Sequence, residues 1–291
     1  MLSQLIANGM IVGSIYALVA LGFGLIYSTT RFFHFAHAAI FTAGAYLAYS
    51  GWLLGLSLTV AIPLAIVGAA MLGALLEVGV YRPLRRKGAS SLILLLASLG
   101  LLIVIQNAIS FIFGDDTKTM RGSAVTEGLS VFGARVTPIQ ISIIAVSVLL
   151  STLCWVFIKY SSKGKAMSAV ANDPELARIV GIQSDQVILF TFVLGSALAA
   201  IASILISFDT DMTPMMGFNA LLMGVVAAIV GGIGSIPGAL LGGLFVGMAQ
   251  HIGVWKLPTQ WQDAIIFVIL ILFLLLRPQG FLGKSLKKAA V

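Results

Sequence analysis

Long apolar stretches, separated by short polar segments, run along almost the whole chain. Nine of them are nearly free of charged residues, and each is continuously apolar rather than alternating. The clearest, residues 139–158, has 20 residues, which as a helix matches a hydrocarbon core roughly 30 Å thick. We therefore predict an all-α integral membrane protein with about eight to ten transmembrane helices. The stretches cover residues 4–28, 36–50, 57–80, 92–113, 139–158, 187–208, 218–234, 237–254 and 262–276.

Composition excludes the main alternatives to this fold. Apolar residues make up 59% of the chain and charged residues 9%, whereas roughly a quarter of a soluble domain is charged. The strands of a membrane barrel would alternate in polarity, and these stretches do not. The first stretch lacks a basic leader and is too long for the apolar region of a signal peptide, so we expect it to remain as the first helix.

The distribution of basic residues predicts the orientation of the chain. If the nine stretches alternate from an N-terminus outside, thirteen of the 17 basic residues fall in the cytoplasm, as the positive-inside rule requires. The C-terminus is then cytoplasmic, and the net charge of +7 indicates a membrane topology rather than nucleic-acid binding. The thirteen are Arg31, Arg82, Arg85, Arg86, Lys87, Lys159, Lys163, Lys165, Arg178, Arg277, Lys284, Lys287 and Lys288, and the outer four are Lys118, Arg121, Arg135 and Lys256.

Two connections between the predicted spans are long. The outer one, residues 114–138, is polar and glycine-rich, and the residues alone leave open whether it docks a partner or is a solvated loop. The inner one, residues 159–186, contains the signals of a short helix: Asp173 suits the N-cap, Pro174 the first helical position and Gly181 the residue past the end.

The predicted helix, Pro174–Val180, would have one apolar face. Leu176, Ile179 and Val180 share that face by the i, i+3, i+4 rule, while Glu175 and Arg178 point elsewhere. A small amphipathic helix of this kind can fill a groove on a partner protein, lie on lipid head groups or pack back on its own chain.

Three segments resemble one family of transporters. The stretch ELARIVG, residues 175–181, is similar to the E-A-A-x-x-x-G loop of ABC importer permeases, with Leu176 in place of the first alanine. The segments from NGMIVGSIYALVALG onwards, ANDPELARIVGI and VVAAIVGGIGSIPGALLGGLFVG resemble the branched-chain amino acid importer permeases, most closely their LivH-type subunits. The likeness runs over nearly the whole chain, and permeases that import urea or short amides share most of these features.

The resemblance implies a function and a set of partners. The chain would be one transmembrane permease domain, residues 1–291, in the inner membrane of a bacterium, importing branched-chain or similar neutral amino acids. It would pair with a second, homologous permease, with cytoplasmic ATPases that bind ATP and Mg²⁺, and with a periplasmic solute-binding protein. Its coupling helix, seated on the ATPase, would comprise Asp173, Pro174, Glu175, Leu176, Ala177, Arg178, Ile179, Val180 and Gly181.

The chain lacks the phosphate-binding loop of an ATPase. Its one GKS sequence, at 283–285, has Pro278 where the first glycine of G-x-x-x-x-G-K-[ST] belongs, and it follows a span rather than a strand. We therefore expect no catalytic activity and no cofactor in this chain, with ATP hydrolysed on other subunits.

Candidates for the transport pathway are few. Gln106 and Asn107 are the most polar side chains inside a predicted span, and they either bond a passing solute or join helices. A second set, where helix-breaking residues interrupt an apolar region, is either a tight hairpin or a pair of half-helices facing a substrate. This set comprises Gly234, Ser235, Pro237 and Gly238.

His34 and His37 have the spacing of a metal-ligand pair, but no Cys, Asp or Glu lies nearby in the sequence to complete a site, which favours an interfacial or packing role. A carrier or channel acting alone would need intramembrane acids or a filter ring, and a membrane enzyme would need a catalytic dyad. The pattern indicates none of these.

Overall fold

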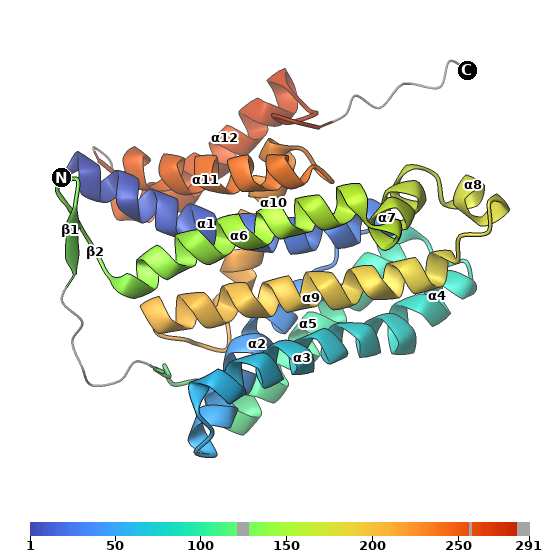
Figure 1. Ribbon diagram of the computed structural model, residues 1–291, viewed down its shortest axis with the longest axis horizontal. Helices are drawn as coiled ribbons and strands as arrows, with labels where there is room; N and C mark the ends of the chain where they lie inside the picture. Colours follow the sequence, from blue (N-terminus) through green and yellow to red (C-terminus); the bar gives the residue numbers. More distant parts are fainter. Residues whose placement is uncertain (121–127, 256–257, 284–291) are drawn as a thin grey trace.

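The computed structural model describes residues 1–120, 128–255 and 258–283, and these residues are almost entirely helical (Figure 1). Within these residues, nine long helices correspond one to one with the nine apolar stretches. They are α1 (Leu2–Thr30), α2 (Ala36–Leu53), α3 (Leu58–Leu76), α5 (Ser91–Phe113), α6 (Pro138–Tyr160), α9 (Ser184–Asp209), α10 (Met216–Gly231), α11 (Ile236–Gly253) and α12 (Gln262–Leu276). The shorter elements are η1 (Glu77–Tyr81), α4 (Arg82–Arg86), α7 (Ser162–Asn172), α8 (Pro174–Ile179), η2 (Thr259–Trp261), β1 (Leu129–Val131) and β2 (Ala134–Val136).

The all-α membrane fold is confirmed, although the helices differ in how strongly they favour lipid. Among the described residues, seven helices are long and apolar enough to cross a membrane. The other two long helices are α10, which has only 16 residues, and α2, which is rich in small and polar residues. Both pack among other helices, α2 against α3, α5 and α9 and α10 against α1 and α11. They need less apolar surface because neighbouring helices, rather than lipid, cover them.

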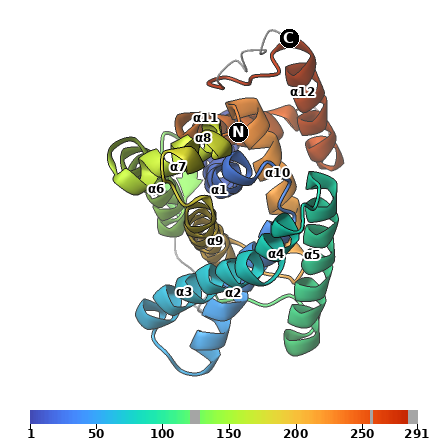
Figure 2. The same cartoon turned by 90° about the vertical axis from the view of Figure 1, so that its right-hand side faces the viewer.

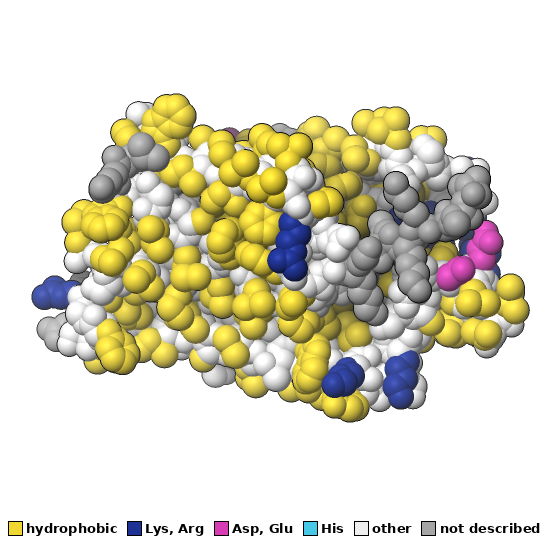
Figure 3. All heavy atoms as spheres, turned by 90° about the horizontal axis from the view of Figure 1, so that it is seen from above, with side chains coloured by type: hydrophobic (Ala, Val, Ile, Leu, Met, Phe, Trp, Pro, Cys, Tyr) yellow, Lys and Arg dark blue, Asp and Glu magenta, His cyan; other side chains and the backbone are white. Residues whose placement is uncertain are grey.

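The bundle is built around α1. This helix lies in the middle, with α6, α9, α10 and α11 around it (Figure 2). The contact between α1 and α11 is close because glycines face each other: Gly9 and Gly13 on α1 lie against Gly247 and Gly243 on α11. Along each helix the two glycines have the G-x-x-x-G spacing that allows helix backbones to approach in a membrane. On the outside, apolar side chains are spread over a large part of the face seen in Figure 3, as expected for a surface in contact with lipid.

The two ends of the bundle differ in chemistry. At the hairpin end, β1 and β2 form an antiparallel pair, Arg135 N donates to Gln4 Oε1 at 2.8 Å, and Lys118 pairs with Met212 in an isolated bridge. The opposite end, which holds α4, α7 and α8 (Figure 1), is the basic end. Its described basic residues are Arg31, Arg82, Arg85, Arg86, Lys87, Lys159, Lys163, Lys165 and Arg178. The positive-inside rule assigns this end to the cytoplasm.

The long connections contain more structure than the sequence indicated. The outer connection forms the β1–β2 hairpin, and the inner one contains α7 in addition to α8. The topology predictions for Arg121, Lys256, Lys284, Lys287 and Lys288 fall outside the described residues.

Candidate functional site

Helix α8 begins at the residue that the capping signals predicted and ends within one residue of the predicted end. Asp173 Oδ1 accepts hydrogen bonds from Glu175 N at 2.9 Å and Leu176 N at 3.0 Å, which satisfies two of the free N–H groups at the helix start. Pro174 occupies the first turn, and Gly181 has a φ of 85°, in the left-handed region that glycine adopts without strain. The helix ends at Ile179, one residue earlier than predicted, with Val180 as its C-cap.

The apolar face of α8 is uncovered. The exposed fractions are 57% for Leu176, 81% for Ile179 and 66% for Val180, whereas Ala177 is buried. We call these three exposed residues the coupling surface. The helix does contact α7 and α9, but it does so through the side that carries Ala177, and the three apolar side chains stay mostly exposed. Figure 1 shows α8 at the extreme of the basic end, where a partner has access to it.

Helix α7 holds α8 against the bundle. The Ser161 hydroxyl accepts a hydrogen bond from Gly164 N at 2.9 Å and caps α7, and Met167 and Val170 are buried. The Arg31 guanidinium, just past the end of α1, donates to the carbonyl of Ala171 near the end of α7. The sequence pattern had not led us to predict α7, although a serine three residues before Gly164 is an N-cap signal.

The segment after α8 leads directly into an ion-pair cluster that the sequence analysis also missed. In the first turn of α9, Asp185 Oδ2 accepts from Arg82 Nε at 2.8 Å and from Arg86 Nη2 at 3.0 Å. Between those two arginines, Arg85 forms two hydrogen bonds to the carboxylate of Glu77. Glu77 is fully buried and belongs to η1, a π-helical turn. The four cationic and acidic side chains of α4 and η1 are thus fixed by specific partners.

The helix-breaking residues form a hairpin, not a pair of half-helices. Helices α10 and α11 pack against each other, with the positions of Gly231 and Gly238 in contact across the turn. The Ser235 hydroxyl caps α11 by accepting from Gly238 N at 3.1 Å, and Pro237 lies in the first turn. The segment after α12 covers this hairpin: Phe281 N donates to Val230 O at 2.8 Å.

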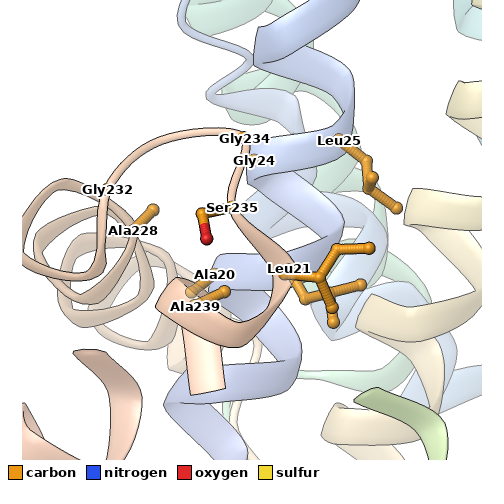
Figure 4. A pocket seen from close by; sticks show the side chains of 10 residues that line it. Ala20, Leu21, Gly24, Leu25, Ala228, Gly232, Gly234, Ser235 and Ala239 are labelled. Carbon is orange, nitrogen blue, oxygen red and sulfur yellow. The ribbon is translucent and has the colours of Figure 1, made fainter. Parts of the chain in front are cut away.

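A small cavity lies between this hairpin and α1. Gly234 and Ser235 line it together with residues of α1 such as Leu21 and Gly24 (Figure 4). Its volume is about 10 Å³, which is no larger than one water molecule requires. A solute the size of an amino acid therefore does not fit there in this conformation. Gln106 and Asn107 do not line this cavity.

Gln106 and Asn107 lie on α5, at the edge of the bundle. Asn107 is exposed and Gln106 half-buried, and Asn107 Nδ2 donates to Ile103 O of its own helix at 2.8 Å. A role in the pathway stays a prediction, and it requires a second protein next to α5.

His34 and His37 lie inside the protein rather than at its interface with the membrane. Both are fully buried, and their ring centroids are 5.9 Å apart. His34 Nδ1 lies 3.1 Å from the Tyr81 hydroxyl and 3.4 Å from Ser98 Oγ. Across the described part of the chain, no group of three His, Cys, Asp or Glu side chains could hold a metal ion. His34 thus links the start of α2 to η1 and α5.

Comparisons with known proteins agree with this architecture. Residues 5–274 match the model of a family described as "Branched-chain amino acid transport system / permease component". The chain belongs to this family. It is 36% identical to the high-affinity branched-chain amino acid transport system permease protein LivH of Escherichia coli strain K12, covering 97% of this chain and 95% of LivH. The corresponding permease protein BraD of Pseudomonas aeruginosa is also 36% identical, with the same coverage.

The fold of the chain is similar to that of a solved structure. The chain superposes on a chain from PsaBC of Streptococcus pneumoniae in complex with Fab, with a TM-score of 0.51 over 94% of this chain and 91% of that one. The identity is 16%, so this match concerns the fold alone. The family match confirms the resemblance that the three sequence segments indicated.

Proposed function

We propose that this chain is a membrane-spanning permease subunit of an ATP-driven importer for branched-chain or similar neutral amino acids. The names of its relatives support the substrate class, because LivH and BraD are named as branched-chain amino acid permeases and align over almost their whole length. The observation that carries the proposal is the coupling surface, an apolar patch on a capped helix at the basic end.

The coupling surface fits a cytoplasmic ATPase. Exposed large apolar side chains outside the membrane usually mark a protein contact, and an amphipathic helix binds by placing its apolar side chains into a groove. In this proposal, the ATPases bind ATP and Mg²⁺ and hydrolyse ATP, and they drive α8 as they close and open. This chain then alternates between outward-open and inward-open states and performs no chemistry of its own.

The exposed side of α5 fits a second permease. Asn107 is exposed on a helix that is otherwise largely apolar, and an amide facing lipid is unfavourable unless a partner covers it. We place the second permease, a homologue of this chain, against α5, with the pathway between the two subunits and near Gln106 and Asn107. The hairpin residues Gly234, Ser235, Pro237 and Gly238 would then border the pathway at its cytoplasmic end.

The hairpin end would receive the solute. In the inner membrane of a bacterium, the positive-inside rule places β1, β2 and the connection before α10 in the periplasm. A loaded solute-binding protein would dock there and release its amino acid into the outward-open state. The exposed Phe132, at the tip of the hairpin, offers an apolar contact.

Purification of the assembly tests this proposal. We expect that this chain, tagged and extracted from its native membrane in mild detergent, elutes with ATPase subunits and a second permease. The loaded binding protein should then stimulate ATP hydrolysis by the eluted complex, and leucine should be required for the stimulation. A chain that elutes alone from well-solubilised membranes, with no ATPase in the fractions, would refute the proposal. Stimulation by urea and not by leucine would change the substrate class only.

A further inference from the structure

Three separate groups of polar contacts lie between the coupling surface and the start of α2. Asp185 lies four residues after Gly181, and Ile182 N donates to Ala177 O at 2.9 Å, so the chain turns back on α8 before α9 begins. Because this connection is short, a movement of α8 also moves the first turn of α9. Asp185 is the first acidic side chain in that turn.

Asp185 joins α9 to α4 through two bonds to one oxygen. Arg82 and Arg86 are one helical turn apart, so both project from the same side of α4, and both donate to Asp185 Oδ2. Their side chains and that of Asp185 are between 31% and 65% exposed. Exposed ion pairs contribute little net stability, so this junction can open at small cost.

The ion pair between Arg85 of α4 and Glu77 is largely buried, unlike the exposed pairs that Asp185 forms. Glu77 is fully buried, and its carboxylate receives both terminal nitrogens of Arg85. A buried pair is costly to break because one charge would be left without a partner in a medium of low dielectric constant. In the same π-helical turn, Tyr81 contacts His34, next to the start of α2. Hence α4 and η1 move as one unit that contacts α2, while the junction with Asp185 is the weak point.

We propose that Arg82, Arg86 and Asp185 form an ion-pair clamp that positions α4 on the base of α9 and opens when the ATPase moves α8. The clamp rests on the proposed function, because it gives a path from the coupling surface to η1 and α2. If the arginines of α4 served only to orient the chain by the positive-inside rule, they would need no acidic partner. Here both arginines share a single acceptor from an element that follows the coupling helix directly.

The clamp is tested in the complete transporter, with both permeases, the ATPases and the binding protein reconstituted in liposomes. The readout is the number of solute molecules imported per ATP hydrolysed. We expect Asp185→Asn to lower this ratio by about fivefold or more, the lower limit of ordinary coupling between sites, while the complex still assembles. Exchange of the charges, with Arg82→Asp and Arg86→Asp combined with Asp185→Arg, should restore part of the ratio. Lys87→Gln, which removes a neighbouring charge outside the clamp, is the matched control.

The outcomes separate the clamp from the proposed function. If the unmodified complex and Lys87→Gln show no ATP-dependent uptake, the proposed function fails, and the clamp fails with it. If both are active and Asp185→Asn imports as many molecules per ATP as the unmodified complex, the clamp alone is overturned. The clamp predicts that Asp185→Asn and the arginine variants import fewer solute molecules per ATP hydrolysed. It also predicts that the charge exchange restores part of this ratio. A spin-label distance between α4 and α9 that lengthens on ATP binding would show the opening directly, and an unchanged distance would contradict it.

Discussion

Replacement of Ile179 by aspartate is expected to abolish solute-stimulated ATP hydrolysis and uptake while leaving the chain folded. Ile179 is 81% exposed in the isolated chain, so the new carboxylate stays in water and costs the fold little. In the complex, the same carboxylate would be buried in an apolar groove without a partner. Loss of a central interface residue costs about 2 kcal/mol or more, which is a roughly 30-fold loss of affinity.

The measurement for Ile179→Asp is the amount of ATPase that co-purifies with the chain, followed by its stimulated rate. Phe132→Asp is the control for ATPase binding, because Phe132 is an even more exposed apolar residue, at 99%, on the opposite, hairpin end. It should leave ATPase binding unchanged. If Ile179→Asp retains its ATPase and its stimulated rate, the coupling surface is not the contact with the ATPase.

Replacement of Gly243 by leucine is expected to prevent stable folding. A Cβ atom at Gly243 would lie 2.5 Å from Ala17 N and 2.6 Å from Ala17 Cα, and both are backbone atoms of α1 that no side-chain rotation can move. The only relief is to separate α1 from α11, which opens the centre of the bundle. Overpacking of this kind costs about 3 kcal/mol or more, a large part of the total stability of about 5–15 kcal/mol for an ordinary protein.

Folding of Gly243→Leu is measured on the chain alone, by its elution profile in detergent and its melting temperature. Gly100→Leu in α5 is the control, since a Cβ atom at Gly100 meets no atom within 4 Å. The control should elute and melt as the unmodified chain does. A Gly243→Leu chain with an unchanged profile and melting temperature would show that the α1–α11 contact is looser than the structure has it.

Features that depend on neighbours in the sequence were predictable. The apolar stretches gave the nine long helices because lipid selects continuous apolar runs of a fixed length. Asp173, Pro174 and Gly181 gave α8 to within one residue because each acts on backbone groups at most three residues away. The family resemblance rested on the same local segments.

Features that depend on distant residues were not predictable. Arg82 and Asp185 are 103 positions apart, and nothing local distinguishes a paired arginine from one that follows the positive-inside rule. The hairpin near Pro237 has the same local sequence as a pair of half-helices, and the choice is made by the packing of α10 on α11. The burial of His34 depends likewise on Tyr81 and Ser98, which belong to other elements.

If this chain forms part of an importer driven by ATP, the reconstituted complex should take up leucine. Proteoliposomes would hold both permeases and the ATPases, with ATP on the ATPase side and the binding protein on the other. We expect that labelled leucine accumulates only when ATP and the binding protein are both present, and that Ile179→Asp abolishes the accumulation. Uptake by this chain alone, without ATP or an ATPase subunit, would contradict it.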